Sequence, residues 1–171
     1  QKLPVIKKYI NGNTLENLKW GLVPSWAKKK DFKALINARL ETIDEKISFK
    51  KLIKLHRCVA VADGFYEWKR EEKNKTPYYF EREDKKNMYM AGIYENDKFC
   101  LITEKASENI SAIHHRQPVI LNEADVNRYL NLELSGSNFL NECKKTKLFF
   151  HEISKDVNKP NNNSISLIQQ L

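Results

Sequence analysis

Polar and ionisable side chains interrupt three otherwise apolar segments of the chain: INARLET at 36–42, DGFYEWK at 63–69 and AIHHRQPVIL at 112–121. A polar group inside an apolar segment needs a hydrogen-bonding partner or a function. The three segments therefore hold the first candidates for catalytic or binding residues. Each motif is weak by itself, because the same residue types also cap turns and cover the wet faces of strands.

The first segment carries Asn37 and Arg39, two residues apart. On an extended segment, side chains at this spacing point to the same face, where one can orient a substrate and the other can hold a phosphate. The alternative is structural: Asn37 caps a turn, and Arg39 pairs with Glu41 or another surface acid. The heptapeptide alone favours the structural alternative.

The second segment places Glu67 between Tyr66 and Trp68, in a strand that follows a predicted turn at 63–64. Aromatic neighbours partly desolvate a carboxylate, which suits it to general acid or base catalysis. The alternative is an alternating strand with Glu67 on its wet face. That arrangement is the commoner one for an isolated glutamate.

The third segment places His114, His115 and Arg116 between a predicted short helix and an apolar strand, a typical position for a cleft. Either histidine can transfer protons or stabilise a developing negative charge, although a lone histidine is more often a satisfied structural residue. The sequence has no H-E-x-x-H or paired Cys/His spacing, no G-x-S-x-G elbow and no phosphate-binding or dinucleotide glycine loop. It therefore predicts neither a metal nor a cofactor.

The elements that must position these residues are mostly short strands. Asn11-Gly12 predicts a hairpin turn, and the lysine run at 28–30 predicts an exposed loop. A helix is predicted over 42–55, because Thr42 and Glu45 have capping-box spacing and apolar residues recur at helical intervals. Strands are expected at 57–62, 65–70, 77–83, 87–94, 98–106 and 148–154, and short helices at 107–112, from 123 and at 138–144. This pattern predicts an antiparallel sheet or barrel with helices.

Composition narrows the class of protein. A chain of 171 residues without a Gly/Pro/Ser-rich linker predicts one domain, and the net charge of +8 favours polyanionic partners, although coding bias toward lysine and asparagine can give the same charge. No apolar run predicts a membrane span or a secretory signal.

Cys58, Cys100 and Cys143 are widely separated and form no C-x-x-C pair, which fits a reducing cytoplasmic setting. Cys58 and Cys100 lie in apolar strands and are not expected to act as nucleophiles.

Taken in order, several segments closely resemble the SRAP domain, the family of bacterial SOS-response-associated peptidases and of eukaryotic proteins that shield abasic sites. These segments are WGLVPSWA (20–27), INARLET (36–42), RCVAVADGFYEWK (57–69), TPYYF (76–80), MAGIY (90–94), LITEKA (101–106), IHHRQPVIL (113–121) and HEISKDVN (151–158). The resemblance implies a single SRAP domain over 1–171, with an α+β fold built on an open, largely antiparallel β-barrel flanked by helices.

The resemblance also assigns roles to residues at the matching motif positions. His115 falls at a variable position of the H-x-R-x-P motif. The implied catalytic residues are Asn37, Glu67 and His114, and the implied DNA-binding residues are Arg39, Arg116, Trp26 and Trp68.

SRAP proteins bind single-stranded DNA that contains an abasic site, whose open-ring form exposes an aldehyde. The amine of an N-terminal cysteine forms a Schiff base with it, and the thiol closes a thiazolidine ring. Members begin Met-Cys-Gly-Arg, whereas QKLPVI aligns with an internal segment of the family, and none of the three cysteines aligns with the reactive one. The domain is therefore expected to be N-terminally incomplete.

The resemblance predicts a bacterial cytoplasmic protein of the DNA-damage (SOS) response that acts at the nucleoid, binds no membrane and is a monomer. Two alternatives stay open. One is a peptidase that uses Glu67 and His114, restricted in its narrowest form to removal of its own initiator methionine. The other is a non-catalytic module that binds single-stranded DNA.

Overall fold

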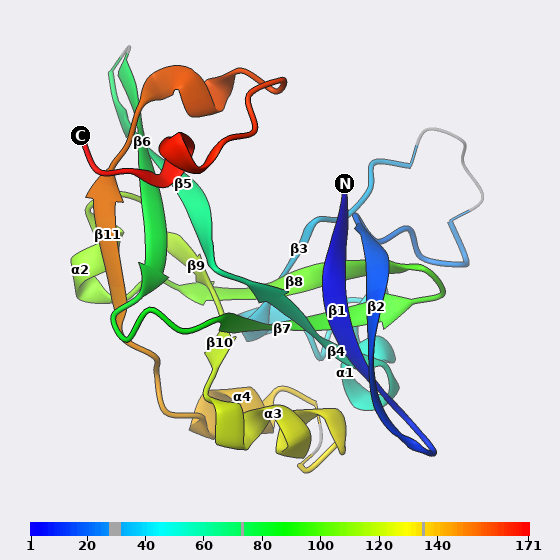
Figure 1. Ribbon diagram of the computed structural model, residues 1–171. Coiled ribbons are helices and arrows are strands. Elements are labelled where there is room, and N and C mark those ends of the chain that lie inside the picture. Colours follow the sequence, from blue (N-terminus) through cyan, green and yellow to red (C-terminus); the bar gives the residue numbers. More distant parts are fainter. Residues whose placement is uncertain (28–31, 73, 135) are drawn as a thin grey trace. The chain divides into compact units, whose positions relative to one another are not determined.

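The computed structural model describes residues 1–27, 32–72, 74–134 and 136–171, and its ribbon is drawn in Figure 1. The predicted lysine loop at 28–30 lies outside the described residues. The chain forms two compact units that alternate along the sequence. The barrel unit comprises 1–62, 88–104 and 118–146, and the three-stranded unit comprises 63–87, 105–117 and 147–171. The prediction of a single domain over 1–171 stays a prediction.

The barrel unit begins with the predicted hairpin. Strands β1 (Lys2–Tyr9) and β2 (Gly12–Trp20) pair in antiparallel register from Lys2 with Lys19 to Tyr9 with Gly12. Gly12 has a φ of +125°, in the region that favours glycine. The Asn11-Gly12 turn was therefore a correct prediction.

Strand pairing in the barrel unit runs in a ring. Strand β4 (Arg57–Ala62) pairs with β1 and β7 (Met88–Glu95), and β7 pairs with β8 (Lys98–Lys105), all antiparallel. A short parallel contact of β8 with Lys19–Trp20 of β2 completes the ring. Strand β10 (Ile120–Leu121) extends β7, and β3 (Asn37–Arg39) lies parallel to β8. This ring confirms the predicted α+β fold with a largely antiparallel barrel.

Short helices cover the barrel. Helices α1 (Leu52–Leu55) and α3 (Glu123–Leu130) contact β4, and α4 (Asn138–Glu142) follows α3. Helix α3 buries Val126, Tyr129 and Leu130, which share one face at i, i+3 and i+4. The Tyr129 hydroxyl donates a hydrogen bond to the Gly92 carbonyl at 3.0 Å, so the apolar face of the helix also satisfies a backbone group of the sheet. No helix among the described residues is long and apolar enough to span a membrane.

The predicted helix over 42–55 is wrong for most of its length. The segment forms a 3-10 turn, η1 (Leu40–Thr42), then a series of turns, and is α-helical only over α1. The Asp44 carboxylate accepts hydrogen bonds from the Ser137 amide (3.1 Å) and hydroxyl (2.5 Å). This distant tie and the burial of Ile43 and Ile53 fix the turns, so tertiary contacts override the local helical pattern.

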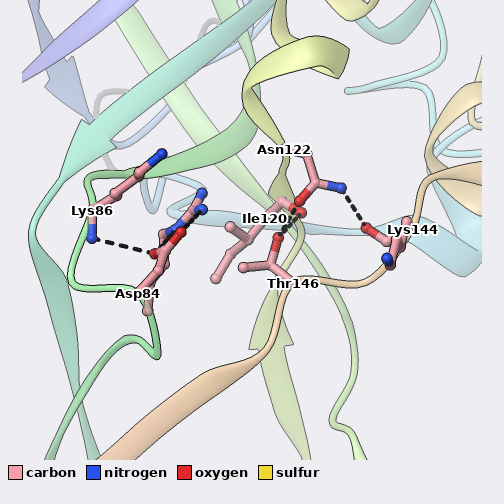
Figure 2. A network of polar contacts seen from close by, with 7 residues as sticks. Asp84, Lys86, Ile120, Asn122, Lys144 and Thr146 are labelled. Atoms are coloured by element: carbon pink, nitrogen blue, oxygen red, sulfur yellow. Dashed lines mark hydrogen bonds and ion pairs between the residues drawn. The ribbon is translucent and has the colours of Figure 1, made fainter.

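Side chains also fix the connections that follow β10 and β6. Within the barrel unit, the Asn122 amide donates to the Lys144 carbonyl at 3.2 Å, and the Thr146 hydroxyl donates to the Ile120 carbonyl at 3.4 Å (Figure 2). Within the three-stranded unit, the Asp84 carboxylate accepts from the Lys86 amide at 3.3 Å. Side-chain bonds to backbone groups thereby tie the segment 144–146 to the end of β10 and hold the turn after β6.

The three-stranded unit is an antiparallel sheet in the order β11-β6-β5. Its strands are β5 (Gly64–Glu71), β6 (Asn74–Arg82) and β11 (Leu148–Glu152). Helix α2 (Glu108–Ser111) and most of β9 (Arg116–Pro118) belong to the same unit. The C-terminal tail adds two 3-10 turns, η2 (Lys155–Asn158) and η3 (Ile165–Ile168), and its Leu171 amide returns to the Glu152 carbonyl.

Candidate functional site

The three-stranded sheet has two faces, because side chains alternate along each strand. One face carries Phe65 and Glu67, opposite Phe80 and Tyr78 on β6, and we call it the Glu67 face. Phe65 and Phe80 stack with ring centroids 4.9 Å apart. The other face carries Tyr66 and Trp68 opposite Tyr79 and Pro77, and we call it the Trp68 face. Glu67 and Trp68 are sequence neighbours on opposite faces.

Glu67 and His114 come together in this unit. The Glu67 Oε2 lies 3.7 Å from His114 Nδ1, and the two side chains are 28% and 33% exposed. Glu67 also accepts a hydrogen bond from the Trp68 backbone amide at 3.2 Å. A half-buried carboxylate beside an imidazole, both open to solvent in part, can take a proton from one group of a substrate and give one to another.

The backbone after α2 fixes the His114 ring. The Arg116 amide donates to His114 Nδ1 at 3.3 Å, and the Arg116 carbonyl lies 3.0 Å from the same nitrogen. The Gln117 side-chain oxygen accepts hydrogen bonds from the Ser107 amide and hydroxyl, which join the two ends of the 107–117 loop. The half-buried Arg116 therefore positions the imidazole through its main chain, whatever its guanidinium binds.

His115 lies beside His114 but is more exposed. The two rings have centroids 4.6 Å apart and are tilted by 44°. The His115 carbonyl accepts from the Ala106 amide, whereas the His114 ring is the one that contacts Glu67. Residue types alone could not choose between the two histidines, and the motif position singled out His114.

Three of the predicted site residues belong to the barrel unit. Asn37 and Arg39 are exposed on either side of the buried Ala38 in β3, which confirms that they share one face. Trp26 is 50% exposed, and its ring meets Phe32 edge-on with centroids 5.9 Å apart. All three side chains are accessible to a ligand.

Trp68 is held from two sides. Its indole N–H donates to Asn158 Oδ1 at 3.0 Å, and Lys75 Nζ lies 4.6 Å from the ring centroid. Sequence reasoning did not single out Asn158 or Lys75. Asn158 closes the HEISKDVN segment, so a motif position was available for it, whereas Lys75 is one lysine among many.

The cysteines of the chain are poor nucleophiles. Burial raises the pKa of the Cys58 thiol well above its ordinary value and raises the pKa of Cys100 to about 12. Burial also raises the pKa of Cys143 to about 11. Because the thiolate is the reactive form, all three thiols stay protonated and unreactive near neutral pH, as the sequence predicted for Cys58 and Cys100.

The family model for the SOS response associated peptidase (SRAP) matches residues 1–160. The chain therefore belongs to the SRAP family. It is similar to the abasic site processing protein YoqW of Bacillus subtilis, with 36% identity over 93% of this chain and 78% of that protein. It is also similar to the abasic site processing protein YedK of Escherichia coli, with 31% identity over 91% of this chain and 74% of that protein.

A solved structure has a similar fold. A crystal structure of a protein from Bacteroides thetaiotaomicron superimposes with a TM-score of 0.86 at 29% identity, covering all of this chain and 82% of that one.

Among the described residues, no group of three or more His, Cys, Asp or Glu side chains is arranged to hold a metal ion.

Proposed function

We propose that this chain is an abasic-site processing protein, which binds single-stranded DNA and forms a covalent DNA–protein adduct with the aldehyde of the abasic site. The observation that carries the proposal is the Glu67–His114 pair, in which a carboxylate and an imidazole lie 3.7 Å apart and partly open to solvent. Membership of the SRAP family and the names of its bacterial relatives support the choice of substrate.

The chemistry requires an amine and a thiol on one residue. The amine nitrogen adds to the aldehyde carbon, and the resulting carbinolamine loses water to give an imine. The thiol then adds to the imine carbon and its proton passes to nitrogen, which closes the thiazolidine. Cys58, Cys100 and Cys143, whose pKa values are raised, are unsuited to the step, and the family resemblance implies that an N-terminal cysteine supplies both groups.

Glu67 and His114 move the protons in this scheme. Glu67 takes a proton from the attacking amine, and His114 delivers one to the departing hydroxyl of the carbinolamine. We assign Asn37 to orienting the amine or the adduct by hydrogen bonding. Arg39 and Arg116 are assigned to the DNA backbone, and Trp26 and Trp68 to stacking on bases. The exposure of Arg39 and Trp26 supports these roles.

The remaining parts of the proposal concern setting. A bacterial protein acting on abasic DNA in the SOS response works in the cytoplasm, at the nucleoid. We propose that it prefers single strands, in which no opposite strand limits access to the aldehyde. We propose a monomer.

A denaturing-gel assay with an oligonucleotide that carries one abasic site tests the function. The natural full-length protein should give a covalent band, and replacing the N-terminal cysteine that the family resemblance implies with serine should abolish it. Glu67→Gln and His114→Gln should each slow adduct formation about 100-fold, the typical contribution of a general acid or base. Glu83→Gln, an exposed change in the same unit, is the matched control. No adduct from the full-length protein would refute the proposal.

A peptidase is the second candidate, favoured by the description of the family model and by the same Glu67–His114 pair. Mass spectrometry of the purified protein tests its narrowest form. Retention of the initiator methionine in Glu67→Gln, with loss in the unmodified protein and in Glu83→Gln, would support self-processing.

Salt-sensitive binding to intact strands without either reaction, weakened by Arg39→Ala and Arg116→Ala, would instead indicate a binding module.

A further inference from the structure

Two cations face each other across the β5–β6 hairpin. Arg70 and Lys75 are directly paired in the register, and like charges in this position repel each other. Neither forms an ion pair with a carboxylate of the part of the chain that the structure describes. The repulsion is therefore uncompensated within the described residues, as expected where an external anion binds.

The pair lies on the Trp68 face. Trp68 precedes Arg70 by two residues, so both side chains leave the same side of β5. Lys75 reaches diagonally across the strands, and its Nζ sits 4.6 Å from the centre of the Trp68 ring. This cation–π contact holds an ammonium and an aromatic surface together in a form suited to a nucleic acid, which offers phosphates and bases side by side.

The C-terminal tail adds a third cation. Asn158 of η2 accepts the hydrogen bond from the Trp68 indole at 3.0 Å. In a 3-10 helix, side chains three residues apart lie above one another, so Lys155 is on the same side of η2 as Asn158. Lys155 is exposed, and we call Trp68, Arg70, Lys75 and Lys155 the Trp68 patch.

Of the carboxylates close in sequence to the Trp68 patch, Glu67 lies on the opposite face of the sheet, and two others have their own cations. Glu71 pairs with Lys69 at 2.5 Å, and Asp156 pairs with Lys159 at 2.8 Å. The exposed Glu72, at the turn with a φ of +47°, is the acidic neighbour without such a partner in the described part of the chain. The local charge of the patch is accordingly positive.

We propose that Arg70, Lys75 and Lys155 extend the DNA contact assigned to Trp68, so that the Trp68 patch binds the phosphodiester backbone on the sheet face opposite Glu67. The proposal rests on the proposed function for the identity of the polymer. A phosphate between Arg70 and Lys75 relieves their repulsion, and movement of Lys75 toward it opens one face of the Trp68 ring for stacking. The patch offers cations and one aromatic ring, so its contribution to binding is independent of base sequence.

Fluorescence anisotropy with a labelled oligothymidylate lacking abasic sites tests the proposal on the natural full-length protein at several salt concentrations. Arg70→Gln/Lys75→Gln should weaken binding about tenfold at 0.1 M salt and reduce the logarithmic salt slope by about 1.4, since each single-strand phosphate contact contributes about 0.7. The matched control is Lys50→Gln/Lys54→Gln, which removes the same charge from two exposed lysines of the barrel unit and should change binding less than twofold.

Two further readouts separate the outcomes. Asn158→Ala should weaken binding by a smaller factor, because it releases the indole without removing charge. Adduct formation at saturating abasic DNA and low salt should persist in Arg70→Gln/Lys75→Gln. If the unmodified protein forms no adduct but the double variant still has the lower salt slope, the proposed function is refuted and the role of the patch is supported. Equal losses in the two double variants, or no loss in the first, would overturn the patch.

Discussion

The two units of the molecule are stabilised by different means. The barrel unit has a large mixed core, which completely buries aliphatic side chains such as Val59 and Ile93 together with aromatic rings such as Tyr129. The three-stranded unit relies on aromatic rings, of which Phe80 is fully buried while Phe65 and Phe150 are half-buried against it. Because these rings are only half-buried, Glu67 and His114 can lie at the surface of the sheet beside them. The unit with the smaller core is therefore the one that holds the candidate proton-transfer pair. The comparison predicts that the three-stranded unit is the more easily opened of the two.

Phe80→Ala should give the largest effect. The ring is fully buried, stacked on Phe65 with centroids 4.9 Å apart and tilted against Phe150 at 5.1 Å, and its removal leaves a cavity in a small core. The expected loss is about 3–5 kcal/mol of unfolding free energy. Hydrogen exchange measured by mass spectrometry should show 63–87 and 147–171 exchanging faster than 88–104. Uniform acceleration through both units would break the distinction between them.

Gly64→Ala should cost slightly less, about 1–3 kcal/mol. An added Cβ would lie 2.5 Å from the Tyr79 ring and closer still to the Phe80 carbonyl oxygen, a backbone atom that cannot move aside alone. Gly12→Ala is the contrasting change, since it meets no neighbouring atom and costs only the strain of its φ of +125°. Urea unfolding of both variants checks the order, which should place Gly64→Ala lower in midpoint.

Tyr129→Phe should cost about 1–2 kcal/mol, because it leaves the buried Gly92 carbonyl without the hydroxyl that lies 3.0 Å away. This change probes the barrel unit. Exchange should accelerate in 88–104 and not in 63–87. The reverse pattern would show that the barrel unit is the weaker of the two.

The smallest effect on stability is expected when the pH is lowered. Hydrogen bonding to Arg82 lowers the pKa of Asp84 from 3.8 to about 2. A carboxyl with a lowered pKa in the folded state stabilises the protein above its unfolded pKa and loses that contribution as the pH falls through the folded value. Stability supplied by Asp84 should therefore disappear between about pH 4 and pH 2. Denaturant titrations of Asp84→Asn should show a weaker dependence on pH across that window, whereas Glu83→Gln should match the unmodified protein.

Local signals in the sequence located most strands, and non-local contacts explain what they missed. Asn11-Gly12 and the alternating residues of β4 to β8 carry their own turn and strand signals. The helix over 42–55 failed because Asp44 and the buried Ile43 are held by distant partners. The parallel pairings of β8 with β2 and β3 join segments far apart in the chain, for which short-range patterns contain no information.

The candidate site shows the same limit. Spacing correctly placed Asn37 and Arg39 on one face of β3, and the order of motifs selected His114 over His115. The approach of His114 to Glu67 depends on how the 107–117 loop folds, which no spacing predicts. Alternation along β5 predicts that Trp68 and Glu67 lie on opposite faces. It does not predict that the Trp68 indole donates a hydrogen bond to Asn158, which is 90 residues further along the chain.

The interleaving of the two units has a consequence for how such a protein can be divided. The polypeptide passes from one unit to the other five times, between residues 62 and 147. No single stretch of the gene therefore encodes either unit, and neither can be expressed, exchanged or duplicated as one continuous fragment. Recombination within this span would separate strands from their pairing partners, so the barrel unit and the three-stranded unit are inherited together.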